Sequence, residues 1–454
     1  MLQVITLVVF VLLIVDGFAV DTNDMAFAKI LRNTNLANLI VWSYWWPVII
    51  ISAIFFGRIW CMVCPMELLT SLAARVGLKC KPNSFVRSGW IITLFYIVIL
   101  FVGIHTLSIH RVPFRMSIYL LALLTSTVIV GLIFRRNTFC AYICPVGHLL
   151  GLYARLAPFG WSTRDMSICR NCKDHSCTTS ANAYVFQGRS CGVDLNPAHI
   201  EDNTNCLLCG QCIKSCDHNN PGIDGRPNPG WFVRPWFKDI FALKPMTAAQ
   251  TAFCLVVSGF VVYELFTEWN VTKGLLLWLP DNINMLLGTE SVWSHGLIKS
   301  LTLFVFLPTL VWLFPYGLFR LAGGKLSIER FFSVFGTAFI PIMAAAHTVK
   351  ALLKTTSRIP YWENAFSDPV GVESARGFLA KSLQLAPLPA WRDPALTVLS
   401  LVLICCGIAV STVVIRKLTM TQLHSHERCA WALYLIPGLY GGAFAVMICL
   451  WRLF

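Results

Sequence analysis

The chain has 454 residues, of which 56% are hydrophobic and only 13% are charged, and its mean hydropathy is +0.66. A soluble globular protein carries about 25% charged residues, so this composition excludes a purely soluble protein and predicts an integral membrane protein. The formal net charge of +14 does not indicate a nucleic-acid partner, because most Lys and Arg residues lie in short loops between apolar runs. We therefore expect no nucleic acid among the partners.

Apolar runs recur along the whole chain. A transmembrane helix needs about 20 consecutive, mainly apolar residues. The first run has no basic segment of the kind that precedes a cleaved signal sequence, which favours a retained helix. The expected fold class is a polytopic α-helical membrane protein with about nine transmembrane helices. The nine runs are approximately 1–20, 37–56, 90–108, 117–134, 249–267, 297–317, 331–352, 395–415 and 430–451.

The distribution of basic residues predicts the orientation. Loops 57–89, 318–330 and 416–429 are rich in Lys and Arg, whereas loops 16–36 and 268–296 are not. Basic loops stay on the inner side of a membrane, which places the amino terminus inside and the carboxy terminus outside. Loop 353–394 is an exception, because its five basic residues would lie outside. We expect a multi-pass protein of a bacterial-type inner (cytoplasmic) membrane with three parts: a four-helix membrane domain 1–134, a cytoplasmic module 135–248 and a five-helix membrane domain 249–454.

Two similar cysteine segments follow the second and the fourth apolar run. In each, an aromatic residue and an Arg precede a Cys, and a Cys-Pro follows; the cysteines are Cys61 and Cys64, then Cys140 and Cys144. Cysteines three or four residues apart share a helix face, so each pair is a candidate for metal binding or redox chemistry. The neighbouring Arg residues would stabilise a thiolate or an anionic cluster. Alternatively, the two segments are structural corners that pack a soluble module onto the membrane helices.

The strongest motif is the spacing C-x2-C-x2-C-x3-C, formed by Cys206, Cys209, Cys212 and Cys216. This is the bacterial ferredoxin run, in which the first three thiolates bind one 4Fe-4S cluster and the fourth binds a second cluster. A zinc ribbon would instead need C-x2-C pairs that are separated by a longer gap. The run therefore predicts iron–sulfur binding.

Four further cysteines precede this run and bring the total to eight, enough for two cubane clusters. The crossed ferredoxin pattern assigns Cys169, Cys172, Cys177 and Cys216 to one cluster, and Cys206, Cys209, Cys212 and Cys191 to the other. The alternative is that Cys177 or Cys191 is a bystander and that only one cluster forms. We expect a small, ferredoxin-like, cytoplasmic insert with two 4Fe-4S clusters as cofactors.

These motifs resemble the membrane polyferredoxins of the NapH and NosR type. The resemblance rests on the two Arg, aromatic, Cys…Cys-Pro segments on membrane helices, followed by the C-x2-C-x2-C-x3-C module, and covers about residues 37–245. It implies two cubane clusters, a cytoplasmic ferredoxin module and electron transfer between membrane quinol and partner proteins. The chain departs from the family in its first pair, which is C-x2-C-P rather than C-x3-C-P. It also lacks a flavin-binding domain of the NosR kind and has five further helices.

Four histidines are candidates for a quinol or haem site. Under the predicted topology His105, His110, His295 and His347 all lie toward the outer ends of apolar runs. Ionisable residues in membrane spans are functional candidates by default, and imidazole can bind a quinol hydroxyl or ligate a b-type haem. The alternative is four interfacial histidines that share no site.

The sequence favours a membrane electron-transfer protein, in which two 4Fe-4S clusters relay electrons between membrane quinol and a redox partner. The expected partners are membrane lipid, the quinone pool, and a redox protein or membrane complex. The chain would act as a quinol dehydrogenase-type subunit, with its own enzymatic activity left open. The alternative is an assembly or maturation factor that supplies electrons, or thiol or metal reduction, to another membrane enzyme through the Cys-Pro pairs.

Overall fold

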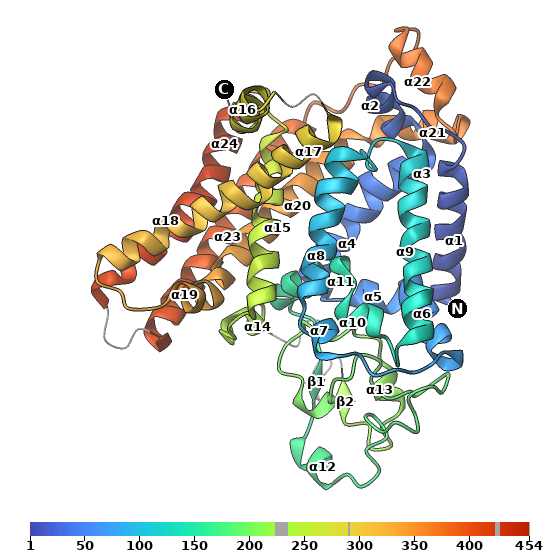
Figure 1. Ribbon diagram of the computed structural model, residues 1–454, viewed down its shortest axis with the longest axis vertical. Coiled ribbons are helices and arrows are strands. Elements are labelled where there is room, and N and C mark those ends of the chain that lie inside the picture. Colours follow the sequence, from blue (N-terminus) through green and yellow to red (C-terminus); the bar gives the residue numbers. More distant parts are fainter. Residues whose placement is uncertain (223–234, 289–290, 423–426, 454) are drawn as a thin grey trace. The chain divides into compact units, whose positions relative to one another are not determined.

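The computed structural model describes residues 1–222, 235–288, 291–422 and 427–453 (Figure 1). Within these residues, seven helices are long and apolar enough to cross a membrane. The prediction of a multi-pass helical protein is therefore confirmed, whereas nine spans are not. The apolar helices Leu2–Gly17 and Trp90–Thr106 are shorter than the seven. The seven are Leu36–Phe56, Pro113–Ile133, Ala248–Phe266, Val292–Leu321, Ile328–Ser367, Arg392–Gln422 and Cys429–Leu453.

The described chain packs as two compact units that interleave in sequence. Unit 1 comprises Met1–Phe18, Val48–Phe95 and Ser117–Ala242, and unit 2 comprises Ala19–Pro47, Tyr96–Met116 and Leu243–Phe454. The three-part division at 134/135 and 248/249 concerns membrane topology and remains a prediction.

Two repeated turns define the architecture of unit 1. Helix α4 (Trp46–Phe56) leads into the short helix α5 (Ile59–Val63) and then α6 (Pro65–Val76), while α9 (Pro113–Ile133) leads into α10 (Thr138–Tyr142) and then α11 (Pro145–Tyr153). Pro begins both α6 and α11, where the missing amide hydrogen costs nothing because first-turn amides have no helical acceptor. Helix α1 (Leu2–Gly17) packs against α5 and α6, and α10 packs against α6.

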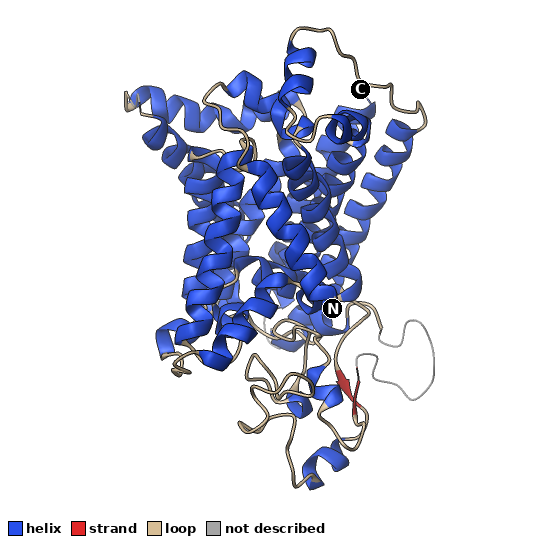
Figure 2. Ribbon diagram, turned by 90° about the vertical axis from the view of Figure 1, so that its right-hand side faces the viewer, coloured by secondary structure: helices blue, strands red, loops and turns tan. Residues whose placement is uncertain are grey.

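The rest of unit 1 is mainly loop. The only two described strands, β1 (Ser162–Thr163) and β2 (Pro221–Gly222), pair antiparallel, with Ser162 opposite Gly222. Short helices α12 (Met166–Asn171) and α13 (Gln211–Lys214) punctuate the loops (Figure 2). A small core forms around the Trp161 side chain, which is 4% exposed and donates from Nε1 to the carbonyl of Pro197 at 2.9 Å. A segment this poor in apolar core needs additional staples, such as metal clusters.

Unit 2 is a bundle of long helices. Its centre is α20 (Phe339–Ser357), which packs against α15 (Ala248–Phe266) and α23 (Arg392–Gln422). Hydrogen bonds between helices specify this packing, as expected where water is absent. The Trp312 indole donates to the Ser258 hydroxyl at 3.2 Å, and the Ser411 hydroxyl donates to the Ala338 carbonyl at 2.7 Å.

Shorter helices complete the two units. In unit 1 they are α7 (Ser84–Arg87) and α14 (Lys238–Phe241); α8 (Trp90–Val98) starts in unit 1 and ends in unit 2. In unit 2 they are α2 (Met25–Thr34), α3 (Leu36–Leu39), α16 (Asn270–Leu286), α17 (Val292–Leu301), α18 (Leu307–Leu321), α19 (Ile328–Phe335), α21 (Trp362–Ser367), α22 (Val372–Leu379) and α24 (Gly442–Leu453). Short π-helical and 3-10 turns join them, including η1 (Ile40–Trp45), η2 (Ile99–Thr106), η5 (Thr302–Phe306), η8 (Glu427–Tyr434) and η9 (Ile436–Gly441).

Candidate iron–sulfur site

The ferredoxin run adopts a loop that turns its amides toward its sulfurs. Leu208 and Gly210 both have positive φ, 51° and 68°, so the chain curls tightly between successive cysteines. Glycine adopts this left-handed conformation without a steric penalty. The amide of Leu208 donates to the Cys206 sulfur and the amide of Gln211 donates to the Cys209 sulfur. Amides that donate to sulfur stabilise thiolates and tune iron–sulfur clusters, so this backbone suits the metal chemistry that the spacing predicts.

Three cysteines of the run lie beside one from upstream. We name Cys191, Cys206, Cys209 and Cys212 the proximal group. Burial, opposed by the Leu208 amide and reinforced by the thiols of Cys209 and Cys191, raises the pKa of Cys206 to about 12. Burial likewise raises the pKa of Cys209 to about 11 and that of Cys212 above its ordinary range. Loss of the protons from these four neighbouring thiols is unfavourable unless a cation takes their place.

The remaining four cysteines of the module form a second cluster of thiols. We name Cys169, Cys172, Cys177 and Cys216 the distal group. Burial raises the pKa of Cys177, and the thiols of Cys216, Cys169 and Cys172 add to the effect in that order. The Asn220 side-chain amide donates to the Cys169 sulfur at 3.1 Å. Pairing of β1 with β2 holds the chain just before Cys169 against the chain just after Cys216.

The two groups contain the same sets of four cysteines that the crossed ferredoxin pattern assigns to two cubanes. A backbone hydrogen bond from the Cys191 amide to the Cys177 carbonyl, 3.0 Å, joins the groups directly. Among the described residues, no three His, Cys, Asp or Glu side chains are close enough to hold one metal ion. A cubane places each thiolate on a different iron atom, so its ligand sulfurs stand further apart than those around a single ion. The donor set fits 4Fe-4S clusters.

The two Cys-Pro segments lie together in unit 1. We name Cys61, Cys64, Cys140 and Cys144 the corner thiols. Cys64 and Cys144 occupy the N-cap positions of α6 and α11, and the Cys144 sulfur accepts from the Gly147 amide at 3.3 Å. Burial raises the pKa of Cys64, and the thiols of Cys61 and Cys144 raise it further. The two predicted pairs are therefore neighbours rather than separate sites.

Arg58 connects the corner thiols to the proximal group. Its side chain is 4% exposed, and its Nη1 donates to the Thr204 carbonyl at 3.1 Å, two residues before Cys206. It also hydrogen-bonds the Cys61 sulfur, and the thiols of Cys61, Cys144 and Cys140 offset the unfavourable burial of its charge. The sequence indicated an Arg near the corner but not this connection.

A buried carboxylate that sequence reasoning missed ties the same elements together. Glu67 on α6 is 1% exposed, and its carboxylate forms an ion pair with Arg189. It also accepts from Asn137 Nδ2 and from Gln3 Nε2, both at 2.6 Å. The only sequence signal was an acidic residue within an apolar helix, two positions after Pro65.

Arg136 anchors the second corner. It has a positive φ of 54°, its Nη1 donates to the Cys191 carbonyl at 2.9 Å, and it pairs with Asp194 at 2.7 Å. The Asn137 amide donates to the Gly192 carbonyl at 2.8 Å. Both corners are therefore fastened to loops that carry proximal-group cysteines.

Three of the four candidate histidines lie in one polar region of unit 2. The His105 ring contacts the rings of Tyr263 and Phe304, with centroids 5.0 and 5.1 Å apart, and His347 contacts Phe260 at 5.9 Å. His110 accepts a hydrogen bond from Arg111 Nε at 3.1 Å. His295 is instead exposed on α17.

Charged residues, Lys350 among them, surround these histidines. Lys350 on α20 pairs with Glu264 at 3.5 Å and with Glu268 at 2.5 Å, and it donates to the Glu264 carbonyl at 2.7 Å. Glu264 acts electrostatically on both His105 and His347. Ionisable groups inside a membrane domain usually pair with one another and mark sites of function.

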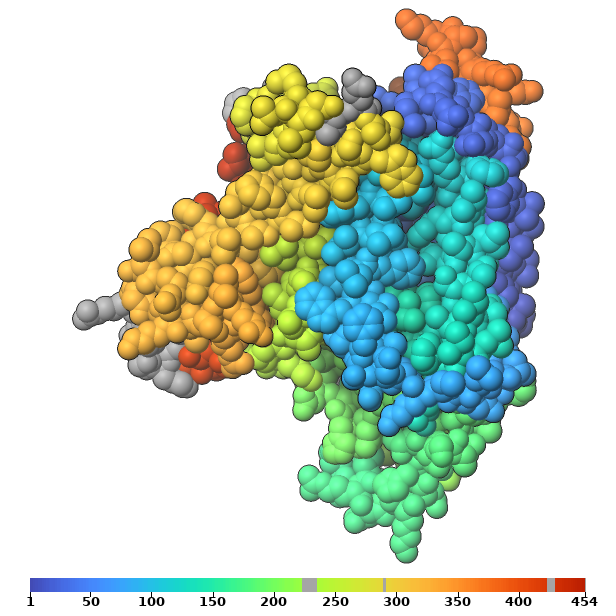
Figure 3. Space-filling view, in the orientation of Figure 1, coloured from blue at the N-terminus to red at the C-terminus, as the bar shows by residue number. Residues whose placement is uncertain are grey.

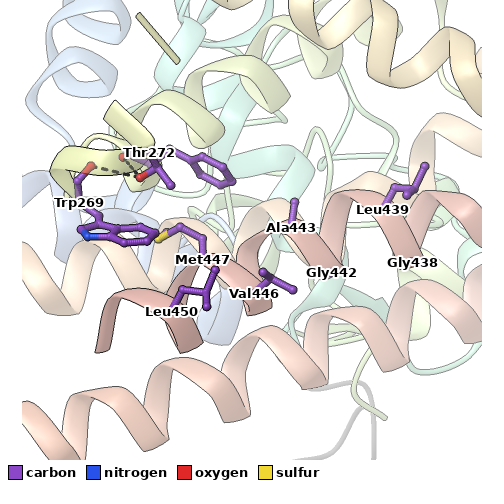
Figure 4. Close-up of a pocket in the computed structure, with 10 residues that line it drawn as sticks. Trp269, Thr272, Gly438, Leu439, Gly442, Ala443, Val446, Met447 and Leu450 are labelled. Carbon is purple, nitrogen blue, oxygen red and sulfur yellow. Dashed lines mark hydrogen bonds between the residues drawn. The ribbon is translucent and has the colours of Figure 1, made fainter. Parts of the chain in front are cut away.

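The cavity in Figure 4 is a different region of unit 2. It measures about 450 Å³ and lies between the end of α15, the start of α16, η9 and α24. Its polar Thr272 hydroxyl is satisfied by the carbonyls of Phe266 and Trp269, at 2.6 and 3.1 Å. The cavity contains none of the predicted site residues; its lining consists of Phe266, Trp269, Thr272, Gly438, Leu439, Gly442, Ala443, Val446, Met447 and Leu450.

Comparison with known proteins gives the class. A family model described as "4Fe-4S binding domain" matches residues 38–82 and 116–164. With the apolar helices and the cysteine groups, this match defines a membrane protein of the polyferredoxin type.

Two curated relatives are similar to part of the chain. Protein NirI of Paracoccus denitrificans is 26% identical to this chain over an alignment of 204 residues. The match covers 39% of this chain and 27% of NirI. Uncharacterized protein MJ0749 of Methanocaldococcus jannaschii is 25% identical over 212 residues, 45% of this chain and 78% of that protein. The match thus spans about a quarter of NirI. No solved structure matches the chain significantly.

Proposed function

We propose that this protein relays electrons between membrane quinol and a redox partner through two 4Fe-4S clusters, one on the proximal and one on the distal group. The matching 4Fe-4S domain and the similarity to NirI support an iron–sulfur electron-transfer role in general terms. The observation that carries the two-cluster proposal is the separation of eight thiols into two adjacent sets of four, joined by the bond between Cys191 and Cys177.

When bound, each cluster supplies one-electron redox chemistry; the chain orients and insulates it. The amides of Leu208, Gln211 and Val193 donate to proximal sulfurs, which stabilises negative charge on that group. Trp161 and Leu208 bury the same group and limit access of water. The segment carrying α12 and distal cysteines is the outermost part of unit 1 (Figure 3), a position suited to a partner protein.

The quinol end of the relay is proposed near Glu264 in unit 2. Quinol oxidation releases two protons with its two electrons, so its site needs groups that accept hydrogen bonds and protons. His105, His347 and Glu264 offer such groups within one neighbourhood. His295 is no longer part of this proposal because it lies exposed on α17. A b-type haem between two facing histidines remains the alternative occupant.

The cytoplasmic position of the module and a bacterial-type inner membrane remain part of the proposal, supported by the distribution of basic loops. The maturation-factor alternative requires reactive corner thiols. Burial raises the pKa of Cys140 and Cys144, the latter to about 11. A thiol of this kind is a poor nucleophile at neutral pH, so the geometry favours the electron relay.

The test is anaerobic purification of the full chain, with iron and acid-labile sulfide counts and electron paramagnetic resonance spectra before and after addition of a short-chain quinol. We expect at least about eight iron and eight sulfide atoms per chain, as two cubanes require, and cluster signals that appear on quinol addition. Zinc without sulfide would overturn the cluster assignment. Filled clusters that quinol cannot reduce, although dithionite can, would overturn the quinol role alone.

A further inference from the structure

We propose that Cys61, Cys64, Cys140 and Cys144 together hold a third iron–sulfur cluster, of the 4Fe-4S class, at the junction of helices α4–α6 and α9–α11. This goes beyond the two-cluster relay, and it can fail or hold independently of that relay.

The first support is convergence of the four thiols from two distant segments. Helix α10, which carries Cys140, packs against α6, whose N-cap is Cys64. A Cβ added at Gly147 would lie 2.6 Å from Arg58 Nη2 and 3.6 Å from the Cys144 sulfur, so the Arg58 of the first corner reaches the Cys144 of the second. Each corner therefore contributes two cysteines to one set of four, the number that a cubane requires.

Backbone donors at this set are a second support. The Cys144 sulfur accepts from the Gly147 amide at 3.3 Å. Cys64 and Cys144 are the N-caps of α6 and α11, helices of 12 and 9 residues whose N-terminal ends carry partial positive charge. The proximal sulfurs Cys206 and Cys209 receive the same kind of N–H donation from residues two positions downstream.

A buried cation without enough anionic partners is the third and independent support. Arg58 is 4% exposed, and its Nε has no hydrogen-bond partner in the described structure. Its Nη2 would lie only 2.6 Å from a Cβ added at Gly147, so a glycine leaves room for the guanidinium beside Cys144. A buried guanidinium beside neutral thiols is costly. A cluster on four thiolates carries net negative charge and would satisfy it.

The family match points to the same residues. The two segments that match the 4Fe-4S binding model, 38–82 and 116–164, contain all four corner thiols and none of the eight module cysteines. The only other cysteine in them is Cys80, which is exposed and belongs to no group.

The location gives the third cluster a place in the relay. Arg58 binds the carbonyl of Thr204, and Arg136 binds the carbonyl of Cys191, so both corners touch proximal-group loops. The proximal group in turn contacts the distal group through Cys191 and Cys177. The three sites therefore form a series from the membrane helices of unit 1 to its outermost loop.

The test compares the full chain with two variants, all purified anaerobically: the corner double variant C64A/C144A and the control C80A. We expect about twelve iron and twelve sulfide atoms in the parent and in C80A, and about eight of each in C64A/C144A. A parent with about eight, unchanged in C64A/C144A, would overturn the third cluster. A parent with about four, lost in C64A/C144A, would support the corner cluster and overturn the two-cluster module instead.

A second measurement applies if the double variant does not fold. Spin counting on the fully reduced parent separates three interacting clusters from two. R58Q retains all the thiols but removes the buried charge. We expect the midpoint potential of one of three signals to fall in R58Q, with the iron count preserved, since a lost cation destabilises the reduced, more negative cluster. Two signals in the parent, both insensitive to R58Q, would overturn the proposal.

Discussion

Arg58 Nη1 and the carbonyl oxygen of Thr204 lie 3.1 Å apart, across 146 positions of the sequence. This single hydrogen bond joins the end of a membrane helix to the loop that begins the ferredoxin run. Arg155 Nε donates to the hydroxyl of the same Thr204 at 3.0 Å. Two buried guanidinium groups thus hold one residue in place, and the position of Cys206 depends on them.

The close approach of Gly151 to the Thr204 backbone should be needed for cluster binding at the proximal group. A Cβ added at Gly151 would lie 2.3 Å from the Thr204 carbonyl oxygen, closer than any real contact. We expect Gly151→Ala to displace this loop and to lose about one cluster, or four iron atoms, per chain. Gly274→Ala, on α16 in unit 2, is the control, because nothing lies within 4 Å of the added Cβ. It should retain its iron and lose no stability, since Ala is a better helix former than Gly. Equal iron loss in both variants would contradict this account.

Removal of the buried Glu67 carboxylate should destabilise unit 1. Glu67→Ala leaves Arg189, Asn137 and Gln3 without their acceptor. Breaking a buried ion pair in this way costs about 3–5 kcal/mol. Denaturant unfolding of the detergent-purified protein, followed by cluster absorbance and by helical circular dichroism, measures the loss. Glu363→Ala, an exposed residue in unit 2, serves as the control. A loss below about 1 kcal/mol would show that water replaces the missing acceptor.

Acid should destabilise the protein through His110. Burial lowers the pKa of His110 well below 6.5. The charges of Arg111, Arg32, Lys354 and His105 lower it further, in that order. The folded state then binds fewer protons than the unfolded state below pH 6.5, so stability falls as the pH drops through that value. The maximum slope is about 1.4 kcal/mol per pH unit.

The check is the free energy of unfolding at pH 7.5, 6.5 and 5.0. Between pH 6.5 and 5.0, the parent should lose about 1.5 kcal/mol more than His110→Gln, which cannot gain the proton. His295→Gln, exposed on α17, should follow the parent. Parallel curves for the parent and His110→Gln would show that His110 does not stay neutral in the folded state.

The ion pairs of Lys350 with Glu264 and Glu268 should be needed for fast reduction of the clusters by quinol. Lys350→Met leaves Glu264 and Glu268 facing each other without their cation. Because the two carboxylates are 25% and 35% exposed, we expect a modest loss of about 1–3 kcal/mol. The rate at which quinol reduces the clusters should fall at least tenfold, while reduction by dithionite is unchanged. The double variant Glu264→Gln/Lys350→Met should recover stability but not the quinol rate. If quinol reduces Lys350→Met at the parent rate, the quinol site lies elsewhere.

The cysteine spacing predicted iron–sulfur binding, because the spacing of ligands is a local property of the sequence. The crossed ferredoxin pattern predicted which thiols would bind the same cluster. It used the run Cys206–Cys216 together with Cys169, Cys172, Cys177 and Cys191. Convergence of the corner pairs could not be predicted, since the two corners come together only through the packing of α10 on α6. Local hydropathy also could not separate full spans from the shorter apolar helices Leu2–Gly17 and Trp90–Thr106, where helix ends depend on neighbours.

Buried charges were the least predictable part. Glu67, Arg189, Glu264 and Lys350 each read as ordinary charged residues, and only tertiary packing pairs them. A charge in an apolar helix indicates that some partner exists, but its identity comes from a segment that can be more than a hundred residues away, as with Glu67 and Arg189.

The anchors at Arg58 and Arg136 precede every module cysteine in the chain. During synthesis, α4–α6 and α9–α11 therefore leave the ribosome before the loops that they fasten. Chains emerge amino terminus first and fold in that order. Folding of α4–α6 and α9–α11 then builds a docking platform before any metal is loaded. Cluster delivery becomes a late step of biogenesis.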